Sequence, residues 1–269
     1  MNRINTYSLL AQEGYLISSC LATGLNELRK ANVHHKGAFY TALFNLSIGL
    51  ERLMKAVVII DHMLEHTMKA PTTKVLKTYG HNILDLHRTC VGISARRTTN
   101  LNPYSSFDAI DKEMMRSLND FAQMSRYHNL DSLSSSTGQV DPLQLWDSIL
   151  LKIIGTDVPR RHVEKILRDA DVVSIALRDC TQVHMVGLSK EPLTLDKSLS
   201  LPRLHEQGTR FAILRLIRIL APIRELLKDI SQVAFYGQDY TSPPVPLMGE
   251  FLEWIWDDRS YVLRKRRWP

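Results

Sequence analysis

The sequence predicts an all-α protein. In several long segments, apolar residues recur at spacings of three and four, which is the period of a helix with one buried face. The 269 residues include only 12 Gly and 11 Pro, fewer than a turn-dense β-sandwich needs. No segment alternates apolar and polar residues between hairpin turns. We therefore expect a bundle of seven to nine helices.

The first half of the chain contains five predicted helical segments, which are 6–30, 36–69, 72–79, 81–97 and 108–127. Segment 36–69 has the clearest apolar seam, made of Leu43, Leu46, Leu50, Leu53, Val57, Ile60 and Leu64. Gly49 weakens this helix by about 1 kcal/mol and predicts a close crossing with another helix. Pro71 is expected to end it.

Residues 131–141 (DSLSSSTGQVD) contain little that could be buried. Such a Ser- and Gly-containing stretch is typical of a linker or a mobile loop. We therefore predict two regions, a helical bundle over residues 1–135 and a C-terminal helical region over residues 136–269.

The second half is also predicted to be helical. Asp141 is expected to cap a helix that begins at Pro142. Longer helices are predicted over 159–188 and 201–235, and a last segment over 246–268. Pro222 lies inside the third of these four segments and is expected to kink or divide it.

Composition excludes several classes of protein. Lys and Arg exceed Asp and Glu by 34 to 28, a net charge of +6 that permits contact with phosphate without requiring it. The three cysteines, Cys20, Cys90 and Cys180, are far apart, which favours a reducing, cytoplasmic compartment over a disulfide framework. Neither a signal peptide nor a membrane span is expected.

Three segments of the first half resemble conserved segments of a known family. They are Gly49–Leu64 (GLERLMKAVVIIDHML), Gly80–His87 (GHNILDLH) and Phe121–Asp131 (FAQMSRYHNLD). Their order and spacing resemble those of the HEPN superfamily, whose small helical bundles occur in prokaryotic toxins, antiviral effectors and nucleotidyltransferase partners. The resemblance covers roughly residues 5–132.

The resemblance implies an antiparallel four-helix bundle, often dimeric. We expect the C-terminal helical region to pack on this bundle. In catalytic members an Arg and a His, separated by four to six residues, meet at the dimer interface and cleave RNA without metal. The His moves a proton, and the Arg stabilises the charge that develops on the phosphorane. Other members bind nucleotides or partner proteins without catalysis.

Two Arg/His pairs are the catalytic candidates. Arg126 and His128 lie in the matching segment but are separated by only one residue. Together with Tyr127 they could contact RNA or a nucleotide, or they could simply cap a helix C-terminus. Arg178 and His184 have the expected spacing, in apolar surroundings that predict partial burial, but they lie outside the matching region.

Two further groups are binding candidates. Glu51 and Lys55 are either a surface ion pair or, by the resemblance, polar groups that line a cleft of the bundle. A basic cluster near the C-terminus could hold phosphate by charge, with Trp268 stacking on a base, or it could be a set of cations at a helix end. This cluster consists of Arg264, Lys265, Arg266 and Arg267.

A distant alternative is a zinc hydrolase. His62, Glu65 and His66 form an H-x-x-E-H pattern that places both imidazoles on one helix face. A third ligand would have to come from a distant residue, so no metal and no cofactor is predicted. P-loop, dinucleotide-binding and nucleophile-elbow motifs are absent.

The resemblance thus implies an RNA-binding, homodimeric protein of a toxin–antitoxin or antiviral defence system. If it is an enzyme, a metal-independent ribonuclease is expected. The alternative is a non-catalytic helical adaptor for a partner protein or a nucleotide.

Overall fold

A computed structural model describes residues 3–97, 101–123, 133–134, 141–237 and 243–269, with side chains from residue 6 onward. In these parts of the chain the regular structure is helical and no strand occurs, which confirms the all-α prediction. The α-helices are α1 (Arg3–Lys30), α2 (Lys36–Glu65), α3 (Thr73–Thr78), α4 (Ile83–Arg96), α5 (Ala109–Gln123), α7 (Pro142–Thr156), α8 (Arg160–Leu177), α9 (Leu195–Tyr236) and α10 (Arg259–Arg264). Two 3₁₀ turns are η1 (Tyr104–Ser106) and η3 (Met248–Leu252).

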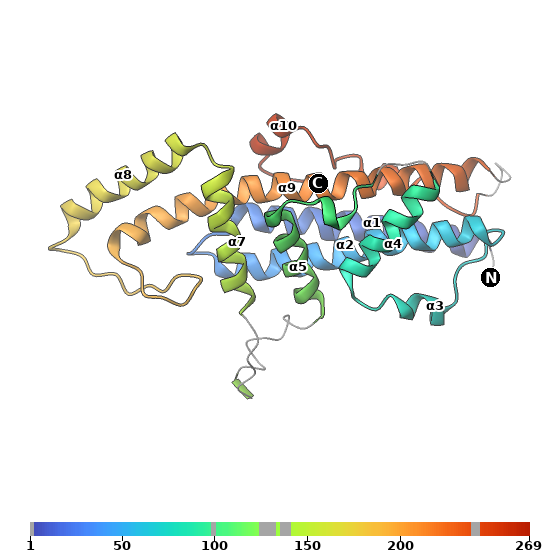
Figure 1. Cartoon of the computed structure of the whole chain (residues 1–269), viewed down its shortest axis with the longest axis horizontal. Coiled ribbons are helices and arrows are strands. Elements are labelled where there is room, and N and C mark those ends of the chain that lie inside the picture. The colour runs from blue at the N-terminus through green and yellow to red at the C-terminus, as the bar shows by residue number, and fades with distance from the viewer. Residues whose placement is uncertain (1–2, 98–100, 124–132, 135–140, 238–242) are drawn as a thin grey trace.

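Three long helices form the body of the molecule. α1, α2 and α9 lie along its long axis, and the shorter α4, α5 and α7 pack on them (Figure 1). One hydrophobic core runs through residues of both predicted regions. The predicted boundary between residues 135 and 136 itself lies outside the described residues. The C-terminal region therefore packs on the first half, as the sequence predicts.

Two glycines allow α1 and α2 to approach closely. A Cβ atom on Gly49 would lie 2.7 Å from a Leu21 methyl carbon and 3.1 Å from the Leu21 backbone nitrogen. A Cβ atom on Gly24 would lie 3.0 Å from the backbone nitrogen of Leu46. A side chain at either glycine would therefore lie too close to the facing helix. The close crossing predicted at Gly49 is confirmed.

Ion pairs that are partly buried tie the shorter helices to the long ones. Arg215 of α9 lies 2.6 Å from Asp108, 2.8 Å from Asp111 and 2.6 Å from Asp157. These carboxylates belong to the start of α5 and the end of α7, so one guanidinium joins three helices. Asp61 of α2 is buried and lies 2.7 Å from Arg96 at the end of α4.

Two predictions about the second half are wrong in detail. The helix predicted to end at Leu188 ends at Leu177, because the next residues turn and run extended to the isolated pairing of Val186 with Pro192. Pro222 does not divide α9, which runs unbroken for 42 residues, and the alternative that it kinks the helix stays a prediction. The predicted cap is confirmed, since Asp141 accepts a hydrogen bond from the Leu143 amide at 2.9 Å.

In the described parts of the chain, no helix is long and apolar enough to cross a membrane.

Candidate functional site

A carboxylate–imidazole pair lies between α2 and the turn that precedes α4. Glu51 is buried, and both of its carboxylate oxygens lie 3.1 Å from Nδ1 of His81. Lys55, one helical turn further along α2, donates to Glu51 at 2.7 Å. The sequence brings these groups together because the i,i+4 spacing aligns Glu51 with Lys55, and the end of α3 returns the chain to α2 at His81.

The pair opens into a cavity of about 360 Å³ between α1 and α2. A second ion pair, between Arg52 of α2 and Glu13 of α1 at 2.7 Å, lies on the wall of this cavity. The hydrogen bond from Arg52 to Glu13 raises the pKa of Arg52, so that its charge is held. The remaining lining is apolar and consists of Leu10, Ile48, Ala56 and Ile59.

This arrangement leaves one imidazole nitrogen available for proton transfer. A carboxylate accepts hydrogen bonds, so the contact with Glu51 favours the tautomer in which Nδ1 of His81 donates and Nε2 can accept a hydrogen bond. The His81 side chain is 64 % exposed. Lys55 uses one of its three donors on Glu51, and Arg52 uses one of its terminal nitrogens on Glu13, which leaves further donors that can face a phosphate.

The prediction that Glu51 and Lys55 line a cleft agrees with this geometry. The roles of His81, Glu13 and Arg52 were missed, because only the folded chain brings α1 and the start of α4 beside Glu51. The Gly80–His81 dipeptide was the one sequence feature that pointed to His81, because a glycine favours a turn. In the structure Gly80 has a positive φ of 50° and turns the chain at this position.

The pair Arg178 and His184 lies on the surface. Both side chains are exposed, in the turn and extended segment that follow α8. The expected partial burial is wrong, because the neighbouring apolar residues of α8 are themselves exposed. The other predicted pair, Arg126 and His128, together with Tyr127, lies outside the described residues.

The side chains of the basic cluster near the C-terminus have different neighbours. Arg264 donates to the Ser260 carbonyl, and Lys265 lies over the Tyr261 ring at 4.4 Å from its centroid. Arg266 instead lines a small cavity with residues of α1 and α9, whereas Arg267 is exposed. Only Arg266 therefore joins cations from other parts of the chain.

The H-x-x-E-H pattern has the expected helical geometry but lacks a complete ligand set. The rings of His62 and His66 stack at 3.9 Å, while Nδ1 of His66 lies 2.9 Å from the His62 carbonyl oxygen. Glu65 lies 3.4 Å from Arg96. Across the described residues, no three His, Cys, Asp or Glu side chains are grouped to hold a metal ion. The zinc alternative therefore gains no support.

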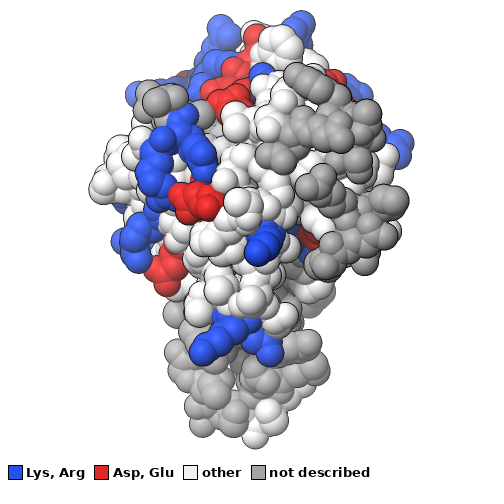
Figure 2. All heavy atoms as spheres, turned by 90° about the vertical axis from the view of Figure 1, so that its right-hand side faces the viewer, with Lys and Arg blue, Asp and Glu red and all other residues white. Residues whose placement is uncertain are grey.

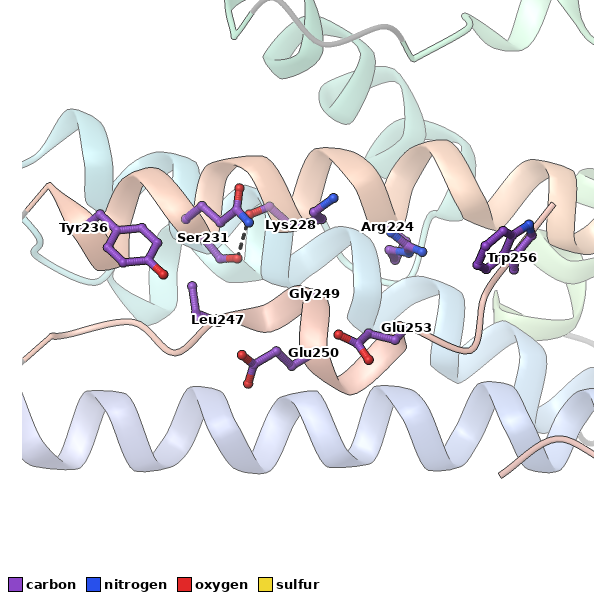
Figure 3. A pocket seen from close by; sticks show the side chains of 10 residues that line it. Arg224, Lys228, Ser231, Tyr236, Leu247, Gly249, Glu250, Glu253 and Trp256 are labelled. Atoms are coloured by element: carbon purple, nitrogen blue, oxygen red, sulfur yellow. Dashed lines mark hydrogen bonds between the residues drawn. The ribbon is translucent and has the colours of Figure 1, made fainter.

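A larger groove of about 590 Å³ lies between α9 and the segment around η3. Figure 3 shows Arg224 and Lys228 on α9, Glu250 and Glu253 across from them, and Trp256 at one end. The two cations and the two carboxylates balance. Charges balance in the same way in the α1–α2 cavity, so net charge does not separate the two. We place the candidate site in the α1–α2 cavity because His81 lines it, whereas no imidazole lines the groove.

The distribution of charge agrees with local rather than extended contacts. Figure 2 shows the end of the molecule that carries the N-terminus, where small groups of Lys and Arg are interspersed with acidic side chains. Among the described residues of this face, Lys and Arg form no continuous basic surface. Any contact with nucleic acid here is therefore confined to individual sites.

Comparisons with protein-family models, with curated proteins and with solved structures return no match to this chain. The resemblance to the HEPN superfamily thus stays a prediction.

Proposed function

We propose that this protein is a metal-independent endoribonuclease whose active site is the α1–α2 cavity. The observation that carries the proposal is the Glu51–His81 pair, which opens into a cavity that also contains Lys55 and Arg52. In keeping with the HEPN-like resemblance, we assign it to a prokaryotic toxin or antiviral defence system. The free thiols of Cys20, Cys90 and Cys180 support a reducing, cytoplasmic setting.

The chemistry needs a base, an oriented phosphate and positive charge. Nε2 of His81 takes the proton of an RNA 2′-hydroxyl, and the 2′-oxygen attacks the adjacent phosphorus. The bond to the 5′-oxygen breaks, and this oxygen takes a proton from water. The products are a 2′,3′-cyclic phosphate and a 5′-hydroxyl, and His81 then releases its proton to solvent. Lys55 and Arg52 stabilise the charge on the phosphorane.

Each group of the cavity has a distinct role in this proposal. Glu51 is a positioning residue, because it holds the tautomer of His81 and does not touch RNA. The apolar wall formed by Leu10, Ile48 and Ile59 offers a surface on which a base can pack. Glu13 holds the Arg52 side chain in place. Arg52 therefore loses little side-chain entropy when it contacts an RNA phosphate in the cavity.

The test is cleavage of labelled single-stranded RNA by the purified protein in EDTA. We expect His81→Ala to lower the rate about 10²- to 10⁴-fold, as for loss of a general base. Glu51→Gln is expected to cause a smaller loss and to change the pH profile, because the amide can stabilise either tautomer. His162→Ala, at an exposed position of α8, is the matched control and should leave the rate unchanged.

Other results would redirect the assignment. Cleavage that is lost in Arg178→Ala and His184→Ala but kept in His81→Ala would move the active site to the segment after α8. Cleavage that disappears with EDTA in the wild-type protein would contradict a metal-independent reaction. Absence of cleavage under every condition would favour the second candidate function.

That second candidate is a non-catalytic helical adaptor for a partner protein or a nucleotide. α8 extends away from the body at one end of the molecule (Figure 1). Several large apolar side chains of this helix are exposed, namely Leu167, Val172, Val173, Ile175 and Leu177. Soluble proteins keep such patches small unless they bind something.

We propose that a second copy of the chain is the first partner to test, since a homodimer is expected. Light scattering should report twice the 30.8 kDa of one chain. Ile175→Asp should halve the measured mass, whereas Lys165→Asp, at an exposed polar position of α8, should not. A monomeric wild-type protein would refute the homodimer.

A further inference from the structure

Three arginines from distant parts of the chain meet at a second cavity, of about 240 Å³. Arg29 lies in the last turn of α1, Arg210 lies in α9, and Arg266 lies in the segment after α10. Lys30 completes the set of cations, and Glu206 is the one carboxylate that lines this cavity. Four cations and one carboxylate give the site a clear positive charge.

The fold holds the third arginine in place. The backbone amide of Trp268 donates to the side-chain oxygen of Asn26 at 2.8 Å, and the side-chain amide of Asn26 donates to the Trp268 carbonyl at 3.1 Å. The Trp268 side chain is buried. Because Arg266 is only two residues before this anchor, it is fixed beside the end of α1. The cluster is therefore held by the folded chain and does not lie on a frayed terminus.

Among the described residues, no carboxylate lies within ion-pair distance of the three arginines, and Glu206 on the cavity wall only partly offsets their charge. Nε of Arg210 is fully enclosed and has no hydrogen-bond partner among the described residues. Arg29 reaches only the Leu263 carbonyl, at 3.4 Å, and Lys30 pairs with Glu27 outside the cavity. Burial, and then the nearby charges of Arg210 and Arg266, lower the pKa of Arg29 to about 10. Enclosed donors without acceptors and like charges at close range both destabilise the empty cavity.

We propose that this cavity binds the phosphate group of a phosphate ester, held by Arg29, Arg210 and Arg266. Guanidinium groups donate pairs of hydrogen bonds to phosphate oxygens and keep their charge when partly buried. The cavity has space for a phosphate with some of its water, because one water occupies about 30 Å³. This site is separate from the α1–α2 cavity and does not depend on RNA cleavage there.

Titration of the full-length protein with inorganic phosphate tests the proposal, with ionic strength held constant by exchange against chloride. We expect a saturable rise in melting temperature and a saturable heat of binding. Arg266→Gln should weaken phosphate binding about tenfold or more, because it removes a charged hydrogen bond. Arg88→Gln removes the same charge from an exposed ion pair of α4 and should leave the affinity unchanged.

Two further variants separate a specific site from general charge. Glu206→Gln should tighten phosphate binding, because it removes the one repelling carboxylate of the cavity. In phosphate-free buffer Arg266→Gln should raise the melting temperature, because it relieves repulsion with Arg29 and Arg210. Arg210→Gln should also weaken binding. Since Arg210 is half-buried and its replacement can disturb folding, the exposed Arg266 position decides the test.

The ester is identified by competition with inorganic phosphate. The competitors are a 5′-phosphorylated RNA, the same RNA with a 5′-hydroxyl, and a nucleoside monophosphate. If the natural ligand is a terminal RNA phosphate, the 5′-phosphorylated RNA should compete and the RNA with a 5′-hydroxyl should not. If it is a free nucleotide, only the nucleoside monophosphate should compete. The proposal is overturned by the lack of a saturable response in the wild-type protein, by equal losses in Arg88→Gln and Arg266→Gln, or by the failure of all three esters to compete.

Discussion

The ring of His87 lies wholly inside the protein, on α4, with its centroid 5.3 Å from that of Phe107. Neither ring nitrogen has a hydrogen-bond partner among the described residues. Burial therefore disfavours the charged ring and lowers the pKa of His87 from 6.5 to about 4. The protein must keep this ring neutral to fold, and its stability should depend on pH for that reason.

The direction of the dependence follows from proton uptake in the two states. Well above pH 6.5 the ring is neutral in both. Between pH 6.5 and pH 4 only the unfolded chain takes up the proton, so acid favours unfolding. At about 1.4 kcal/mol for each pKa unit, the full loss is about 3 kcal/mol, of which about 2 kcal/mol is gone near pH 5.

The perturbation is His87→Leu, which keeps an apolar side chain of similar size in the core and removes the titration. The free energy of unfolding is measured by urea denaturation near pH 7.5 and near pH 5. We expect the wild-type protein to lose about 2 kcal/mol more than the variant between these conditions. His162→Gln, at an exposed position, is the control and should behave as the wild-type protein does. An equal loss in wild type and His87→Leu would refute the reasoning.

Two further predictions concern packing and charge in the core. Gly49→Ala should lower the free energy of unfolding by about 1–3 kcal/mol, because its Cβ would overlap Leu21. A Cβ atom on Gly92 of α4 would meet nothing within 4 Å, so Gly92→Ala should raise the free energy of unfolding by about 0.5–1 kcal/mol. Urea denaturation of both variants measures these changes. Equal effects of the two substitutions would contradict the close crossing at Gly49. Arg215→Gln should cost about 1–3 kcal/mol, because it leaves three partly exposed aspartates, at the start of α5 and the end of α7, without their shared cation. Arg160→Gln, which breaks an exposed pair with Glu164, should change stability by less than about 1 kcal/mol, and a similar cost in both arginine variants would show that the Arg215 network adds nothing.

The starts and ends of most helices were predictable from local chemistry. The side chain of Asp141 satisfies a free amide at the start of α7, as its place before Pro142 predicts. Gly49 predicts a close helix crossing because glycine has no Cβ atom, and this can be seen from the identity of that one residue. The end of α8 was not predictable, since apolar residues at its C-terminus have helical spacing whether they are buried or exposed. A proline inside a helix usually divides or kinks it, but α9 continues through Pro222. Residues of α9 on both sides of Pro222 are buried, and their packing keeps the helix continuous.

The two candidate sites differ in how much of each could be predicted without the tertiary structure. Glu51 and Lys55 are one turn apart, so local geometry alone aligns them. His81 joins them only because the chain returns at Gly80, and Arg52 meets Glu13 only because α1 crosses α2. The cluster of Arg29, Arg210 and Arg266 gathers side chains from three separate segments, and no pattern within any one of these segments marks it.

By itself, the sequence determined that this protein is helical and where most of its main helices lie, because helix period, caps and prolines act within a few residues. Only the tertiary structure decided that α9 completes the core of the first half and which charged groups meet at the two cavities. These contacts join residues far apart in the chain, and their partners are selected by the packing of whole helices and not by local spacing.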